Sequence, residues 1–243
     1  MISRGQSDVA QQRAPPPVAS PVYRSTLKGL NIQAPQGGSF FSQTCDLPEH
    51  FPDSTRNIIM WRLALFILGL LITCWLGMML VHECGHMLAA ICSGGAVARL
   101  EWPAWGFSRT DVSPNPHPLL VVWAGPLFGA VLPLLLSLAL RGLRIRSVIV
   151  EIFSGFCLLA NGIYLSAGSF DRIGDTADLL KFGCPILMLW VVGLPLAVAG
   201  LAQWHTLGPA LGISRASKTE MYLAAALGGI LLAASIIWQS IIT

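Results

Sequence analysis

The sequence predicts an all-α polytopic membrane protein with about five transmembrane helices. Three observations point to this fold class: 54% of the 243 residues are hydrophobic, only 11% are charged, and the apolar residues gather in long stretches. An average soluble domain carries roughly 25% charged residues, so this chain has too few to cover the surface of a water-soluble globule. The same composition excludes disorder of the whole chain, which requires low hydrophobicity and high charge.

The chain begins with a polar segment, residues 1–56, which we interpret as a flexible N-terminal tail. It is rich in Pro, Gln, Ser and Gly and contains the run Pro15-Pro16-Pro17. Such compositions favour extended, mobile chain over a packed core. No apolar stretch follows Met1, so we do not expect a cleaved signal peptide.

Five windows after this tail are long and apolar enough to cross a bilayer, which takes about 20 predominantly apolar residues. They cover residues 58–80, 119–140, 148–169, 184–203 and 221–242. The first continues without a Pro or Gly-rich break to about Cys92, so we expect one helix over 58–92 that extends beyond the hydrocarbon. The lipid bilayer is therefore the first predicted partner. A net charge of +3 without a long basic run gives no reason to expect nucleic acid.

The segment 93–118, between the first two windows, combines turn residues with aromatic ones. It contains Gly94-Gly95 and the run from Trp102 to Phe107. This mixture predicts an interfacial loop or a short hairpin. Such a segment either anchors the chain at the membrane surface or contacts a substrate, and the sequence leaves both interpretations open.

One motif in the helix expected over 58–92 carries chemistry. Residues 82–86 read His82-Glu83-Cys84-Gly85-His86, an HExxH pattern. On a helix, positions i and i+4 share a face, so both imidazoles can reach one ion, and zinc accepts imidazole nitrogen readily. Glu83 lies about 100° around the helix, beside the ion, where it can take a proton from bound water.

Ionisable residues inside an apolar segment cost free energy, so such a cluster indicates function. The alternative is a helix whose His–Glu–His face only forms hydrogen bonds to other spans. Asn161, within the third window, is expected to form a hydrogen bond between helices rather than to contact a substrate backbone.

A third metal ligand must come from elsewhere in the chain. The richest source is the segment 169–178, where Asp171, Asp175 and Asp178 follow at i, i+4 and i+7 and would share one face of a helix. The segment is either the source of the ligand or a solvated acidic loop before the fourth window. His117 and His205 lie at the edges of windows and are expected at the interface rather than on the metal.

These residues resemble the site-2 protease family of intramembrane zinc metalloproteases. The HECGH motif lies in an apolar helix after Met78-Met79-Leu80-Val81, and Ala124-Gly125-Pro126-Leu127 is similar to the family's Ala-Gly-Pro segment. The run from Gly174 to Leu180 resembles the family's Leu-Asp-Gly motif, whose Asp is the third zinc ligand. When this run is aligned with the family motif, Asp175 takes the position of the third zinc ligand.

The chain also departs from the family pattern. The family usually has Asn and Pro several positions before the ligand Asp and Gly directly after it, whereas this chain has Ala167, Phe170 and Thr176. Asp171 therefore stays an alternative third ligand. The resemblance covers roughly residues 66–182, so the last two windows lie outside it.

The resemblance implies a three-helix metalloprotease core over residues 57–183, with the spans 58–92, 119–140 and 148–169 and the Asp-containing segment. Two C-terminal transmembrane helices follow in 184–243. It implies a zinc metalloendopeptidase in which Zn²⁺ is held by His82, His86 and Asp175. Glu83 is then the general base, and the substrate is a transmembrane protein unwound locally at the scissile bond.

Two other classes of protein fit the same residues. One is a non-proteolytic zinc-binding membrane protein, a transporter or an assembly subunit, and the other is a structural subunit without metal. A transporter needs ligands along a continuous path, and the sequence offers one compact site. Lys and Arg in the short loops favour a cytoplasmic N-terminus. The resemblance implies the reverse, so the orientation stays open.

Overall fold

Five helices in the described part of the chain are long and apolar enough to cross a membrane, which confirms the predicted multi-pass fold by length and composition. The structure is a computed structural model that describes residues 53–207 and 216–242, and most of the predicted tail lies outside these ranges. The five helices are α1 (Asp53–Cys92), α2 (Pro118–Gly142), α3 (Val148–Ser166), α6 (Ile186–Leu207) and α7 (Lys218–Ile242). The first helix begins at Asp53, slightly earlier than the predicted boundary at residue 57.

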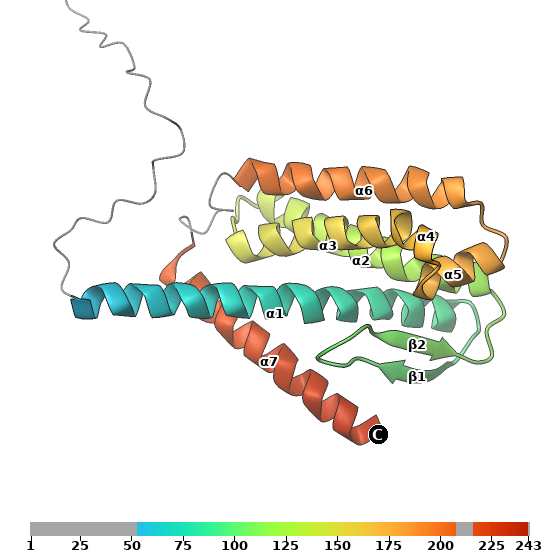
Figure 1. The fold of residues 1–243 in the computed structure, drawn as a ribbon, viewed down its shortest axis with the longest axis horizontal. Coiled ribbons are helices and arrows are strands. Elements are labelled where there is room, and N and C mark those ends of the chain that lie inside the picture. The colour runs from blue at the N-terminus through green and yellow to red at the C-terminus, as the bar shows by residue number, and fades with distance from the viewer. Residues whose placement is uncertain (1–52, 208–215, 243) are drawn as a thin grey trace, which may run out of the picture. The chain divides into compact units, whose positions relative to one another are not determined.

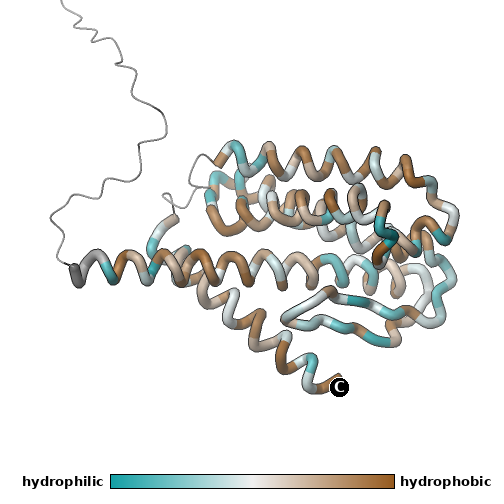
Figure 2. Tube along the Cα trace, in the orientation of Figure 1, coloured by the Kyte–Doolittle hydropathy of each residue, from teal (hydrophilic) through white to brown (hydrophobic). Residues whose placement is uncertain are grey.

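The spans form a layered bundle in which α1, α2, α3 and α6 run side by side and α7 crosses α1 obliquely (Figure 1). Helix α1 packs against α2 and α7, and α3 packs between α2 and α6. Large apolar side chains such as Leu68, Leu187 and Ile230 are exposed along the outer faces of the spans. Figure 2 shows this hydrophobic colouring along the helices and hydrophilic colouring in the strands. An apolar exterior is what a bilayer requires and what water disfavours.

Glycines allow the closest helix contacts, and the crossing of α1 and α7 depends on one such pair. A Cβ atom added at Gly228 would lie 2.5 Å from the carbonyl oxygen of Gly69. One added at Gly69 would lie 2.5 Å from the Cα atom of Ala225. Without a side chain at either position the two backbones approach directly, as in other membrane helix pairs with small residues at the interface.

The segment between α1 and α2 forms a short antiparallel hairpin, which confirms that part of the expectation. Strand β1 (Val97–Glu101) pairs with β2 (Arg109–Val112), and Leu100 lies opposite Thr110 in the register. The hairpin lies along the C-terminal half of α1 (Figure 1), where the indole of Trp102 donates a hydrogen bond to the carbonyl oxygen of Leu76 over 3.2 Å. At the turn, the ring of Phe107 contacts that of Trp75, with centroids 6.2 Å apart.

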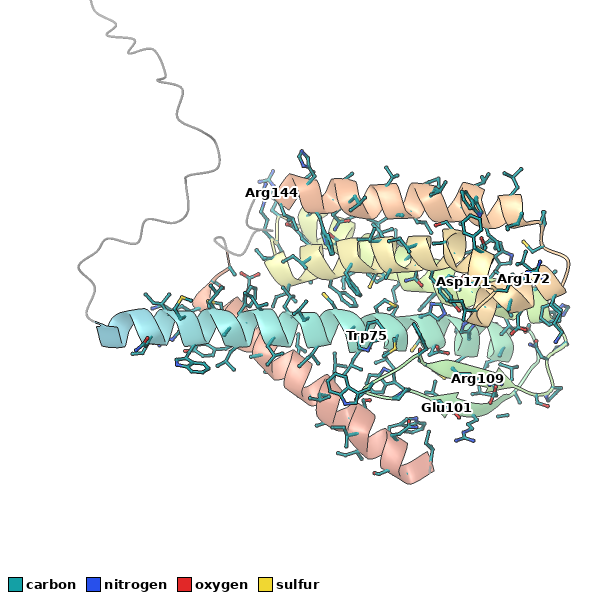
Figure 3. The ribbon with its side chains drawn as sticks, in the orientation of Figure 1. Trp75, Glu101, Arg109, Arg144, Asp171 and Arg172 are labelled. Carbon is teal, nitrogen blue, oxygen red and sulfur yellow. The ribbon has the colours of Figure 1, made fainter. Side chains whose placement is uncertain are left out.

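The acidic segment after α3 forms two short helices, and its three aspartates do not stack as they would on one continuous helix. Helix α4 (Gly168–Asp171) ends where Arg172 adopts a left-handed conformation with φ 50°. The next helix, α5 (Gly174–Lys181), begins after Ile173 in extended conformation. Asp171 and Asp178 are exposed and Asp175 is not, so the three side chains do not share a face. Figure 3 shows Asp171 and Arg172 at this end of the bundle.

Because the crossing of α1 and α7 depends on Gly228, the substitution Gly228→Ala should destabilise the protein by about 1–3 kcal/mol through overpacking. The midpoint of thermal unfolding in detergent measures this. The neighbouring Gly229→Ala is the matched control, since a Cβ atom there would meet nothing within 4 Å. Equal midpoints for the two variants would contradict the close crossing.

Candidate metal centre

Three side chains converge on one point inside the bundle, between α1 and α5. The Nε2 atoms of His82 and His86, one helical turn apart on α1, lie 3.2 Å from each other. The Oδ2 atom of Asp175 lies 2.8 Å from Nε2 of His82 and 3.2 Å from Nε2 of His86. Both histidines are buried and Asp175 is partly buried, and together they form a group able to hold a metal ion. Of the two candidate third ligands, the structure brings Asp175 to the histidines and leaves Asp171 exposed on α4.

The far side of each imidazole is fixed by a carbonyl oxygen. Nδ1 of His82 lies 2.8 Å from Oδ1 of Asn161, and Nδ1 of His86 lies 2.8 Å from the carbonyl oxygen of Val121. Carbonyl oxygens only accept hydrogen bonds, so each ring carries a hydrogen on Nδ1 and turns Nε2 toward the shared point. Metal-binding histidines are held in this way in most metalloproteins.

Asn161 therefore does form the predicted hydrogen bond between helices, from α3 to α1. Its amide orientation is itself fixed, because Nδ2 donates to the carbonyl oxygen of Cys157 over 2.9 Å and leaves Oδ1 facing His82. The position of Asn161 deep in an apolar span predicted an interhelical partner. The identity of that partner as a metal-site histidine depends on how α1 and α3 pack.

Backbone conformation at the first residue of α5 accompanies the turn of Asp175 toward the histidines. Gly174 has φ 51°, and a Cβ atom there would lie 2.2 Å from the hydroxyl of Tyr164. That hydroxyl accepts a hydrogen bond from the backbone N–H of Asp175 over 2.7 Å. The Oδ2 atom of Asp175 is thereby held beside Nε2 of both histidines.

Two glycines leave the room that the centre occupies. A Cβ atom at Gly125 of α2 would lie 2.2 Å from Nε2 of His86 and 2.8 Å from Nε2 of His82. A Cβ atom at Gly85 of α1 would lie 2.4 Å from the carbonyl oxygen of Ala124. Glycine in the Ala124-Gly125-Pro126 segment thus keeps the ligand atoms clear, and glycine in the HExxH motif lets α2 approach α1.

Glu83 follows His82 in the chain, but its carboxylate forms hydrogen bonds with the hairpin. Its side chain is only 2% exposed. Oε1 accepts a hydrogen bond from the hydroxyl of Ser108 over 2.6 Å, and Oε2 accepts one from the hydroxyl of Thr110 over 2.5 Å. The hairpin therefore contacts the HExxH motif directly, a role that neither interpretation of this segment included. The polar residues of this loop do not by themselves indicate a contact with Glu83, because the contact forms only when the loop folds back on α1.

Two other histidines, expected at the interface, do not join this group. His117 precedes α2, His205 lies near the end of α6, and both are exposed. Neither belongs to the metal-binding group found among residues 53–207 and 216–242. Comparison of the chain with models of known families, with characterised proteins and with solved structures finds no match.

Removing the side-chain acceptor behind His82 should weaken the centre without removing a ligand. For Asn161→Leu we expect zinc affinity to fall by roughly 10–100-fold, as found for groups that orient metal ligands. Competition with a chromophoric chelator measures this affinity. Asn161→Asp keeps an acceptor oxygen and should bind zinc more tightly than the Leu variant, whereas equal affinities for both variants and the parent protein would contradict the orienting role.

Filling the space in front of the ligands should abolish metal binding. For Gly125→Ala we expect zinc per chain to fall to background, because the added methyl carbon overlaps Nε2 of His86. Elemental analysis of purified protein gives this ratio. Gly142→Ala, on the same helix and with nothing within 4 Å of the added atom, should retain zinc. Zinc retained in both variants would contradict convergence of the histidines at this point.

Proposed function

We propose that the protein is an intramembrane zinc metalloprotease that hydrolyses peptide bonds of membrane-spanning proteins. The observation that carries the proposal is the convergence of His82, His86 and Asp175, with Glu83 beside His82 in the same motif. The resemblance of the HExxH helix, the Ala-Gly-Pro segment and the Asp175 segment to site-2 proteases supports it further.

The donor set fits zinc in number, type and spacing. Two imidazole nitrogens and one carboxylate oxygen are ligands that zinc accepts, and catalytic zinc sites use three protein ligands so that one position stays open for water. Ligands at bond lengths of about 2.0–2.1 Å in a tetrahedral site lie about 3.3 Å apart. The separations of 2.8, 3.2 and 3.2 Å in this chain need only small adjustments to reach that spacing.

Each residue has a defined role in the proposed reaction. His82, His86 and Asp175 hold the ion, which supplies Lewis acidity by lowering the pKa of water and polarising the scissile carbonyl. Glu83 accepts the proton of the attacking water and passes it to the leaving amine. Each carboxylate oxygen offers about two lone-pair sites, so the bonds from Ser108 and Thr110 leave sites free for this proton.

The depth of the motif supports a substrate that is itself embedded in the membrane. His86 precedes the end of α1 at Cys92 by about 9 Å along the helix axis, at a rise of 1.5 Å per residue. The site thus lies in an apolar helix but near one end of it. A substrate helix must unwind at the scissile bond, because its carbonyl groups are otherwise engaged in the helix.

The test compares wild type with Glu83→Gln for zinc content and for cleavage of a model transmembrane substrate in detergent or liposomes. We expect equal zinc in both proteins and a rate at least 10²-fold lower in the variant, the range for loss of a general base. Glu101→Gln, which removes a carboxylate on the hairpin that pairs with Arg99, is the control and should cleave normally.

Two results would decide against the proposal. Cleavage by Glu83→Gln at the wild-type rate would remove Glu83 from the reaction. Stoichiometric zinc in wild type without cleavage of any transmembrane substrate would favour the non-proteolytic alternative, a zinc-dependent transporter or assembly subunit.

A further inference from the structure

The two residues that contact Glu83 share the face of the hairpin that turns toward α1. Ser108 directly precedes β2 and Thr110 lies within it, and alternate residues of a strand face the same side. Arg109 and Asp111 occupy the opposite face, where they pair with each other over 2.7 Å and are exposed to the surroundings. Figure 3 shows Arg109 and Glu101 on the hairpin. One face of the hairpin therefore contacts Glu83, and the opposite face carries the pair Arg109 and Asp111.

The other strand of the hairpin is held by the last span, α7. The hydroxyl of Ser235 donates to the carbonyl oxygen of Trp102 over 2.8 Å, and the indole of Trp238 donates to the carbonyl oxygen of Leu100 over 3.0 Å. Ser235 and Trp238 are three residues apart and share a face of α7. The carbonyl groups of Leu100 in β1 and of Trp102 just after it thus both accept hydrogen bonds from α7. The helix thereby covers the outer edge of β1.

The register connects these two sets of contacts. Leu100, held by Trp238 of α7, lies opposite Thr110, which holds Glu83. Trp102, two residues after Leu100, is only 6% exposed. It packs with Leu76 and Met79 of α1 and with partly buried leucines of α7. The hairpin is therefore fixed between α1 and α7 at the position where its hydroxyl groups meet the carboxylate.

The burial of α7 agrees with this connection. Within the described part of the helix its buried residues are Ala224, Gly228 and Ser235. Gly228 lies against α1, and the Ser235 hydroxyl bonds the hairpin. Most other side chains of α7 are exposed, and its contacts with the body are made chiefly to α1. The helix also meets α3, where the Glu220 carboxylate accepts a hydrogen bond from the backbone N–H of Val148 over 2.8 Å.

We propose that Ser108 and Thr110 are positioning residues for Glu83, and that α7, through Ser235 and Trp238, holds the hairpin that carries them. The proposal rests on the function proposed above, in which Glu83 is the base. A buried carboxylate needs hydrogen-bond partners to offset the loss of water. Here the partners also restrict where its oxygens lie, and small displacements of a reacting group cost much of the rate.

The first experiment removes the two hydroxyl groups from the full chain. For Ser108→Ala/Thr110→Val we expect kcat to fall about tenfold or more, with KM and zinc content within about twofold of wild type. Thr110→Ser restores a hydroxyl at one position and, combined with Ser108→Ala, should recover part of kcat. Asp111→Asn, on the opposite face of the hairpin, is the control. An unchanged kcat in the double variant would overturn the positioning role.

The second experiment tests whether α7 acts through the hairpin. For Ser235→Ala/Trp238→Phe we expect faster hydrogen exchange of the backbone amides of residues 97–112, a lower kcat and unchanged zinc. Ser240→Ala, an exposed serine of α7 that bonds only its own helix at Ile237, is the control. Added to Ser108→Ala/Thr110→Val, the α7 substitutions should lower kcat little further, because residues acting through one contact are not additive.

The outcomes separate the two proposals. The α7 substitutions could reduce kcat by the same factor whether or not the Ser108 and Thr110 hydroxyls are present. That result would show that α7 does not act through these hydroxyls. Unchanged hairpin exchange would overturn the link between α7 and the hairpin even if kcat fell. If wild-type protein binds zinc but cleaves nothing, the proteolytic function and the positioning of a base fall together, and hydrogen exchange alone decides the link to α7.

Discussion

The contact between two imidazoles of α1 and the carboxylate of Asp175 is the interaction on which the rest of the described structure depends. Ionisable groups within apolar spans are costly unless they pair with one another or hold an ion. His82 and His86 lie in such a span and pair with Asp175 of α5. Gly85 and Gly125 leave the room for this where α1 meets α2, and Gly174 leaves room for Tyr164 of α3. The packing of the core and the chemistry of the centre are therefore set by the same contacts.

Around this contact the protein arranges two kinds of support. Behind the histidines, Asn161 and the carbonyl oxygen of Val121 fix which ring nitrogen faces Asp175. Beside them, the hairpin supplies hydroxyl groups to Glu83 and is itself bonded to α7. The cluster that could hold an ion thus depends on α1, α2, α3 and α5, whereas the proposed base depends on the hairpin and α7. Substitutions in these two regions should separate metal affinity from turnover.

The membrane spans and the histidine pair could be predicted from the sequence. The position of Asp175 and the contacts of Glu83 could not, because they depend on how the chain folds. Apolar stretches of span length identify membrane helices without knowledge of their neighbours, and the i, i+4 spacing of His82 and His86 places both on one face of a helix. The choice between Asp171 and Asp175 depended on a break in the helix at Arg172, a residue type that rarely adopts positive φ. The contacts of Glu83 with Ser108 and Thr110 required the hairpin to fold back on α1, which the spacing of polar residues in a loop does not encode.

Whether Asp175 completes the centre is tested by comparing the zinc affinity of Asp175→Asn with that of Asp171→Asn in the purified protein. The two substitutions make the same chemical change four residues apart, one at the histidines and one on the exposed end of α4. One zinc per chain in wild type and Asp171→Asn, with binding lost or strongly weakened in Asp175→Asn, is the predicted result. Wild-type affinity in Asp175→Asn, or loss of zinc in Asp171→Asn instead, would contradict the assignment of the centre.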